Sequence, residues 1–182
     1  MNRKILNQEF FDRKTLVVAK DLLGKYLVRR VRLHQGYVVT KEQITEVEAY
    51  IGPHDLACHS SKGRTKRTEI MYCKAGTLYV YFVYGMYWML NVVTEEKDYP
   101  SAILIRGTEQ FKGPGVLTRE LKITGELNGK PANKKTGLWF ESDLSAKGGS
   151  ASGGKILRLP RVGVNYAGPI WANKKYRFVL KG

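Results

Sequence analysis

A run of β-branched and aromatic residues at positions 77–94 constrains the fold of this chain more than any other segment. It reads TLYVYFVYGMYWMLNVVT, with Gly85 near its middle. Residues of these types fit a pleated, half-buried strand, and a glycine between two such halves is typical of a tight antiparallel turn. The sequence therefore predicts a hairpin of two strands, residues 77–84 and 86–94, with its tip around Tyr84.

A second hairpin is predicted upstream of the first. Residues 25–33 and 37–50 are rich in β-branched and aromatic residues, and His34, Gln35 and Gly36 form a turn between them. Further strands are expected at residues 102–106, 156–164 and 176–180.

Helices are expected to be few and short. Asp12 can cap a helix whose apolar residues include Leu16 and Leu22, and Gly24 is well placed to end it. Two more short helices are predicted at residues 64–74 and 116–121. The Gly- and Ser-rich segment 142–155 is expected to be a mobile loop, because so polar a run buries little apolar surface.

Many strands with a few short helices favour an α+β fold. We expect a curved antiparallel sheet from which the hairpin of residues 77–94 protrudes. The 182 residues are enough for a single domain, residues 1–182, that buries about two thirds of the surface exposed by its unfolded chain.

The balance of charges indicates a polyanionic partner. Lys and Arg outnumber Asp and Glu by 31 to 16, which gives a formal charge of +15 and a pI near 9.8. Nucleic acid is the leading candidate and an anionic membrane surface the weaker one. No apolar run is long enough to cross a bilayer, and the polar start MNRKILNQEF lacks the apolar core of a signal peptide. We therefore expect a soluble, cytoplasmic protein with no membrane partner.

The two cysteines, Cys58 and Cys73, are too few for a disulfide framework or a Cys-rich zinc site. They fit a reducing compartment. A mixed metal-ligand set of Cys58, His59 and Cys73 stays open as an alternative, but the expectation is that the protein uses no metal.

Glu48 is the residue that most suggests chemistry. Alternation with period two places Ile44, Glu46, Glu48 and Tyr50 on one face of the predicted strand. A carboxylate among tyrosines, in a strongly basic protein, points to a reaction on a nucleic-acid base. From the residues alone, Glu48 can equally be a solvated strand acid paired with a neighbouring Lys or Arg, with Glu46 as its natural control.

Seven segments, taken together, resemble one known family. They are LLGKYLVRR, ITEVEAYIGPHDLACHS, GRTKRTEIMY, GTLYVYFVYGMYWMLNVV, AILIRG, GPGVLT and RVGVNYAGPIWANKKYRFV. In order and spacing they resemble the alkyladenine (3-methyladenine) DNA glycosylase family, in its compact bacterial form. The chain departs at residues 107–110, Gly-Thr-Glu-Gln, where the family more often has Ala-Leu-Glu-Pro, and in the loop 142–155.

The resemblance implies an enzyme of DNA base-excision repair. Such an enzyme rotates a damaged purine out of duplex DNA and hydrolyses the bond that joins it to deoxyribose. The implied substrates are alkylated and deaminated purines, namely 3-methyladenine, 7-methylguanine, hypoxanthine and ethenoadenine. The implied product is an abasic site without strand cleavage, formed by a monomer with no cofactor.

The resemblance also implies a catalytic group. Glu48 matches the general base that holds and deprotonates the attacking water, and Arg106 matches the arginine that orients this water and the carboxylate. A main-chain carbonyl near Val162 matches a third contact.

Five further positions match residues that hold the base or fill its place in the duplex. Tyr50 and His59 match the residues on one face of the flipped base, and Tyr81 matches the one on the other face. Asn91 matches the residue that crowds the exocyclic amino group of normal guanine, and Tyr84 matches an intercalating wedge. Without the resemblance, these would be core or turn tyrosines, a loop histidine and a strand-edge asparagine.

Two other classes of protein share the charge and the aromatic hairpin: a non-catalytic nucleic-acid-binding module and a small structural nucleoprotein. Glu48 is the feature that separates them from the enzyme. Candidate phosphate contacts in all three cases are Lys25, Arg29, Arg30, Arg32, Arg64, Lys66, Arg67, Lys134, Lys135, Lys174, Lys175 and Arg177.

Overall fold

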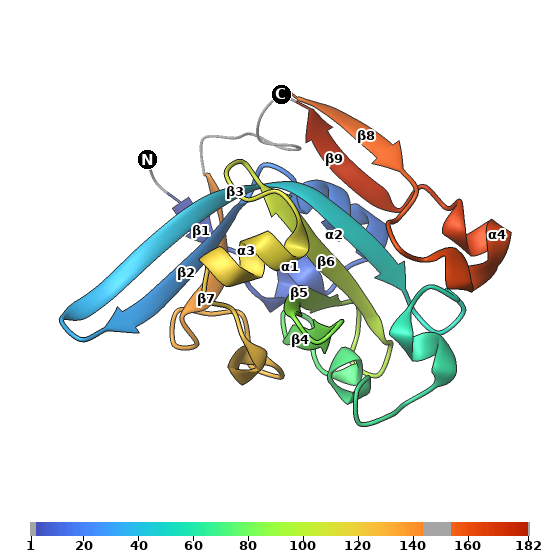
Figure 1. The fold of residues 1–182 in the computed structure, drawn as a ribbon, viewed down its shortest axis with the longest axis horizontal. Coiled ribbons are helices and arrows are strands. Elements are labelled where there is room, and N and C mark those ends of the chain that lie inside the picture. The colour runs from blue at the N-terminus through green and yellow to red at the C-terminus, as the bar shows by residue number, and fades with distance from the viewer. Residues whose placement is uncertain (1–2, 144–153, 182) are drawn as a thin grey trace.

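The curved antiparallel sheet expected from the sequence is present in a computed structural model of the protein, which describes residues 3–143 and 154–181 (Figure 1). The α+β fold class is confirmed. Along the main path of the sheet the strands follow the order β1 (Arg3–Ile5), β7 (Leu138–Asp143), β2 (Tyr26–Leu33), β3 (Gly36–Ile51), β6 (Ser101–Thr108), β5 (Tyr87–Thr94) and β4 (Leu78–Val83). Off this path, β8 (Lys155–Leu159) pairs with β9 (Arg177–Lys181), and β9 also pairs with β3.

The strand β3 organises the sheet because it changes partners along its length. Its first half pairs with β2, and its second half pairs with β6 on one edge and β9 on the other. The register against β6 shifts on both sides of Glu46. Such a bulge rotates the following side chains. Ile44 therefore packs in the core with Val47 and Ala49, and the expectation that Ile44 shares a face with Glu48 is wrong.

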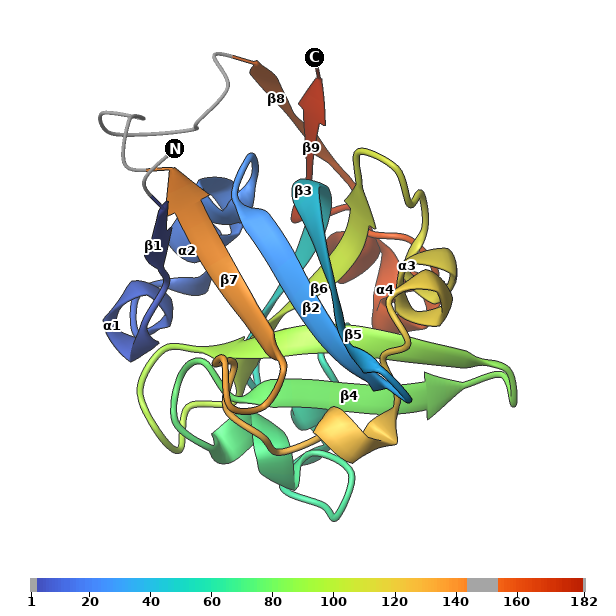
Figure 2. The same cartoon turned by 90° about the vertical axis from the view of Figure 1, so that its left-hand side faces the viewer.

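Both predicted hairpins are confirmed. In the β4–β5 hairpin, Tyr84 and Gly85 have positive φ angles of 53° and 66°, and the amide of Met86 donates to the carbonyl of Val83 at 3.1 Å. Two central residues with positive φ match the twist of the flanking strands. Figure 2 shows the turn of this hairpin extending beyond the neighbouring elements.

The helix predicted near residues 12–24 is shorter than expected. α2 spans Thr15–Leu22, and Gly24 follows it with a φ of 78°, as predicted. Asp12 does not cap it but follows a separate short helix, α1 (Gln8–Phe11). The carboxylate of Glu95 replaces the expected cap and accepts from the backbone amide of Thr15 at 3.0 Å. The cap comes from a residue 80 positions away, so local sequence could not reveal it.

The other helices are also short. α3 covers Pro114–Glu120, close to the prediction, and α4 covers Gly168–Ala172, which was not predicted. The helix expected at residues 64–74 is reduced to a 3₁₀ turn, Glu69–Tyr72. In Figure 2, α1 and α2 lie on one side of the strands and α3 and α4 on the other.

Three differences concern the strands. β1 and β7 were not predicted. β8 ends at Leu159, so the strand expected at residues 156–164 is too long. Within the segment expected to be a loop, Ser142 and Asp143 belong to β7, while residues 144–153 lie outside the described residues.

The largest core cluster joins distant parts of the chain. It includes Leu22 of α2, Val47 of β3, Leu78 of β4, Ile103 of β6 and Phe140 of β7, all of them buried. Burial of these side chains fixes β3 and β6 in place, and both strands carry residues of the candidate site.

Candidate active site

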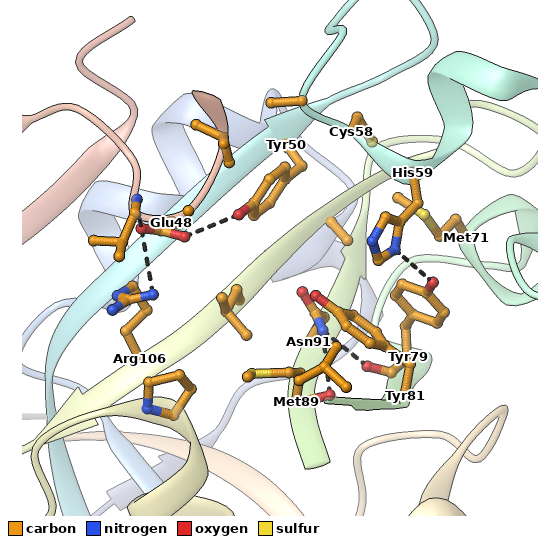
Figure 3. Close-up of a pocket in the computed structure, with 18 of the residues that line it drawn as sticks. Glu48, Tyr50, Cys58, His59, Met71, Tyr79, Tyr81, Met89, Asn91 and Arg106 are labelled. Carbon is orange, nitrogen blue, oxygen red and sulfur yellow. Dashed lines mark hydrogen bonds and ion pairs between the residues drawn. The ribbon is translucent and has the colours of Figure 1, made fainter. Parts of the chain in front are cut away.

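A cavity of about 320 Å³ lies against the second half of β3, and it is lined by residues from the four strands β3, β4, β5 and β6 and from the loops and short helices around them. All eight residues singled out in the sequence line it: Glu48, Tyr50, His59, Tyr81, Tyr84, Asn91, Arg106 and Val162. Figure 3 labels six of these eight residues and shows how they are arranged around the cavity.

Glu48 is completely buried in the cavity wall, and three groups hold its carboxylate. The amide of Val162 donates to Oε1 at 2.8 Å, and Nη1 of Arg106 lies 3.5 Å from the same oxygen. The hydroxyl of Tyr50 donates to Oε2 at 2.9 Å (Figure 3). Because an ionised carboxylate oxygen can accept two hydrogen bonds, Oε2 keeps one acceptor position for a further donor.

The burial of Glu48 changes its acidity. Removal from water raises the pKa of its carboxyl above the ordinary value, while Arg106, the Val162 amide and the Tyr50 hydroxyl counteract part of that rise. A raised pKa brings a carboxylate closer to the range in which it is an effective proton acceptor at physiological pH.

Glu46 has a different environment, although it is only two residues away. Its Oε1 accepts from Nε of Arg106 at 2.9 Å and from Nη1 of Arg177 at 3.1 Å. It does not line the cavity. Arg106 thus bridges the two acids, and only Glu48 faces the space in which a substrate could lie.

Tyr50 is held by a buried ion pair that the sequence did not reveal. Nη2 of Arg161 donates to Oδ1 of Asp55 at 2.8 Å, and both side chains are fully buried. The guanidinium of Arg161 also lies over the ring of Tyr50, 4.8 Å from its centre. Since Val162 follows Arg161 directly, this pair positions two of the three groups that contact Glu48.

His59 is neutral at physiological pH in this site. Burial, assisted by the positive charges of Arg67 and Lys62, lowers its pKa to about 4. Its Nδ1 lies 3.0 Å from the hydroxyl of Tyr79. Tyr79 was not among the predicted site residues, although the period of two along a strand places it on the same face of β4 as Tyr81.

The aromatic rings are arranged differently from the stack that the resemblance implies. The ring centres of His59 and Tyr81 are 4.7 Å apart in an edge-on contact. A base between two stacked rings needs them about 7 Å apart, twice the van der Waals separation of carbon atoms. Tyr50 and Tyr81 both line the cavity, and in Figure 3 their rings lie apart, Tyr50 above the middle of the view and Tyr81 below it.

Asn91 is a buried residue with a fixed orientation. Its Nδ2 donates to the carbonyls of Tyr79 at 3.1 Å and Met89 at 3.3 Å. Two carbonyls can only accept, so the amide nitrogen must face them. The strand hydrogen bond considered in the sequence analysis is therefore present, and the same bond leaves a rigid amide in the cavity wall.

Tyr84 lies at the mouth of the cavity, in the turn of the β4–β5 hairpin. It is 82% exposed, more than any other large apolar or aromatic side chain among the described residues. Its neighbour Met86 is also exposed. An exposed aromatic side chain in a tight turn is available for contact with a partner.

The departure from the family pattern at residues 107–110 does not reach the cavity, because none of these residues lines it. Across residues 3–143 and 154–181, no group of three or more His, Cys, Asp or Glu side chains is placed to hold a metal ion. The thiol of Cys58 is instead buried against Ser60. In the same part of the chain, no helix is both long and apolar enough to cross a membrane.

A basic protein with a buried carboxylate in an aromatic cavity, beside an exposed aromatic turn, has the features of an enzyme that acts on a base extruded from nucleic acid. Comparison with known proteins gives the family. The model of the methylpurine-DNA glycosylase family matches residues 9–113 and 108–182. The chain belongs to this family, whose members are DNA-repair hydrolases that act on N-glycosyl bonds of DNA.

Individual relatives agree with the family match. A protein of Legionella pneumophila strain Paris is 45% identical over 98% of this chain and 95% of its own length. One of Methanocella arvoryzae is 42% identical over 90% and 86%, and one of Wolbachia pipientis wMel is 47% identical over 70% and 71%. Each is provisionally named a 3-methyladenine DNA glycosylase.

Proposed function

We propose that the protein removes damaged purines from duplex DNA by rotating the nucleotide out of the helix and hydrolysing its N-glycosidic bond. The substrates are 3-methyladenine, 7-methylguanine, hypoxanthine and ethenoadenine, and the product is an abasic site in an uncut strand. The observation that carries this proposal is the complete burial of Glu48 in the wall of an aromatic cavity.

Glu48 acts as the general base. Among the residues that the structure describes, Val162 and Arg106 occupy Oε1, whereas Oε2 has only the Tyr50 hydroxyl as a partner. Oε2 therefore accepts the proton of the water that attacks C1′ of the sugar. The carboxylate also stabilises the positive charge that develops on the sugar as the base departs.

The cavity wall suits cationic purines. A purine methylated at N3 or N7 carries positive charge, which favours the electron-rich faces of Tyr50 and Tyr81. Hypoxanthine and ethenoadenine are neutral and need a proton as they leave. His59, with a pKa of about 4, does not hold that proton at neutral pH.

The reaction is simple hydrolysis carried out by a monomer. Among the described residues, the lining of the cavity includes no lysine that could attack the sugar and form a covalent intermediate.

A non-catalytic binding module is the alternative, and the environment of Glu48 argues against it. Burying a carboxylate costs free energy even when it is hydrogen-bonded. A module that only binds DNA gains nothing from a buried carboxylate in the wall of its pocket, because the negative charge repels the DNA phosphates.

The matched variants Glu48→Gln and Glu46→Gln test the proposal. Single-turnover release of hypoxanthine from a duplex should fall by at least about 100-fold in Glu48→Gln, because the general base is lost. It should fall by less than about tenfold in Glu46→Gln, which can still accept from Arg106. Lesion binding should persist in both variants.

The products complete the test. Alkali should be needed to cut the strand after the wild-type reaction, and borohydride should trap no protein on the DNA. Undiminished base release by Glu48→Gln would contradict the assigned mechanism, whereas a trapped adduct would contradict simple hydrolysis.

A further inference from the structure

The β2–β3 hairpin projects from the sheet as a two-stranded arm, in a direction different from that of the β4–β5 hairpin (Figure 1). β7 pairs with β2 only as far as Arg29, and β6 pairs with β3 only from Ile44 onward. In the part of the chain that the structure describes, the strand residues between positions 30 and 39 therefore find their strand partners only among themselves.

The register of the arm gives it two chemically different faces. Arg30 pairs with Val39 and Arg32 with Tyr37, whereas Val31 pairs with Val38. Side chains of directly paired residues lie on the same face of a sheet. We call the first set, Arg30, Arg32, Tyr37 and Val39, the basic face of the arm.

The basic face is open to solvent. Tyr37 is 61% and Val39 54% exposed. The guanidinium of Arg30 lies 5.1 Å from the centre of the Tyr37 ring. It also donates to the main-chain carbonyl of Lys134 at 2.8 Å, and Lys134 is itself an exposed cation. Arg32 makes no ion pair with any described residue.

The charge of the arm is of one sign. From Lys25 to Lys41 the sequence has no Asp or Glu. Apolar and aromatic side chains exposed together mark a contact surface. Arginines beside them that have no acidic partner among the described residues indicate an anionic partner molecule.

We propose that the basic face of the β2–β3 arm is a second DNA contact, which binds the duplex that flanks the damaged nucleotide. A two-stranded ribbon fits the width of a DNA groove, and its arginines can reach the phosphates at the groove edges. In Figure 2 the turns of both hairpins lie to the right of β1 and α2, whereas Figure 1 shows the arm projecting away from the β4–β5 hairpin, so the arm would meet duplex that extends beyond the nucleotides at Tyr84. The arm adds affinity and supports scanning, while the chemical step belongs to the cavity.

The double variant Arg30→Ala/Arg32→Ala tests the proposal. Its matched control is Lys4→Ala/Lys20→Ala, which removes two exposed charges from β1 and α2, away from both hairpin turns. Because each lost phosphate contact reduces the salt slope by about 0.9, the arm variant should bind undamaged duplex with a log–log slope shallower by about 2. The control should change the slope by less than about 0.5. Equal slopes in the two variants would overturn the proposal.

Catalysis and cross-linking provide independent readouts. Single-turnover release of 7-methylguanine at saturating protein should stay within about twofold of wild type in the arm variant, since the arm is distant from Glu48. A photoreactive amino acid in place of Tyr37 should cross-link to a DNA strand. Cross-linking to a second copy of the protein instead would show that the arm is a self-association surface and overturn the proposal. The outcome is separate from that of Glu48→Gln, which alone tests the reaction.

Discussion

At the scale of single residues, the site depends on which groups surround Glu48. The carboxylate is buried, yet its donors come from Tyr50 on the same strand, Arg106 on the adjacent strand and the backbone of Val162 in a distant loop. Because side chains alternate with a period of two along a strand, the sequence itself places Glu48 and Tyr50 on the same face of β3. The other two contacts depend on how β6 and the loop after β8 approach β3.

The pH dependence of base release should report the acidity of Glu48. The reaction needs its carboxylate ionised, and burial raises its pKa, so the single-turnover rate should fall on the acid side with a midpoint above the ordinary glutamate value of about 4.3. Since Arg106 lowers this pKa, Arg106→Gln should move the midpoint to higher pH, in addition to slowing the reaction. His59→Asn should leave the midpoint in place. A midpoint that follows His59 instead would contradict the assignment.

The Asp55–Arg161 pair should matter for stability. Asp55→Asn leaves the buried guanidinium of Arg161 without its counter-charge, which should lower the free energy of unfolding by about 3–5 kcal/mol and Tm by on the order of 10 °C. Asp98→Asn is the control, because Asp98 pairs with Arg64 at the surface and such pairs contribute about 1 kcal/mol or less. Urea unfolding followed by circular dichroism compares the two. Equal losses of unfolding free energy in the two variants would show that the buried Asp55–Arg161 pair stabilises the fold no more than a surface pair does.

At the scale of elements, the β4–β5 hairpin supplies lining residues of the cavity from both of its strands and an exposed aromatic side chain from its turn. Tyr81 on β4 and Asn91 on β5 line the cavity, and the turn between the strands presents Tyr84 at its mouth. Three residues, Tyr84 to Met86, connect the paired strand ends Val83 and Tyr87, and the positive φ of Tyr84 and Gly85 keeps this turn tight. The hairpin was predictable because its residues have strong strand preferences and the turn contains glycine.

The resemblance implies that Tyr84 is an intercalating wedge, and this hypothesis predicts a difference between damaged and undamaged DNA. In a Glu48→Gln background, which prevents turnover, Tyr84→Ala should weaken binding of a lesion duplex by about 10–100-fold, the loss expected for one stacked aromatic side chain. Binding of undamaged duplex at low salt should change far less, and Tyr84→Phe should preserve both affinities. Fluorescence anisotropy measures each binding constant. Equal losses with the two duplexes would count against the wedge.

At the scale of the whole molecule, the structure divides the basic residues by task. Arg29 donates to main-chain carbonyls of Leu121, Lys122 and Gly137, and Arg64 pairs with Glu69. Arg177 likewise pairs with Glu46, so these three candidates from the sequence have intramolecular roles. The net charge of +15 nevertheless leaves many cations free for a polyanion.

Salt should therefore control binding more than chemistry. Affinity for undamaged duplex should fall by at least about 100-fold between about 50 and 200 mM salt, as expected for about four or more phosphate contacts. The single-turnover rate at saturating protein should change little over the same range, because Glu48 is shielded from solvent. A weak salt dependence of binding would contradict an electrostatic mode of DNA contact.

The sequence by itself determined most of the strands, both hairpins and, through seven matching segments, the family and eight of the residues that line the cavity. These depend on local preference or on residue identity, which a chain displays directly. Tertiary structure alone decided the rest. The bulge at Glu46 directs the side chain of Ile44 toward the core. Glu95 caps the helix that Asp12 was expected to cap, and Asp55 pairs with Arg161, which lies 106 positions later in the chain. Each of these outcomes depends on contacts between segments far apart in the chain, and such contacts exist only after the sheet has curved and the core has packed.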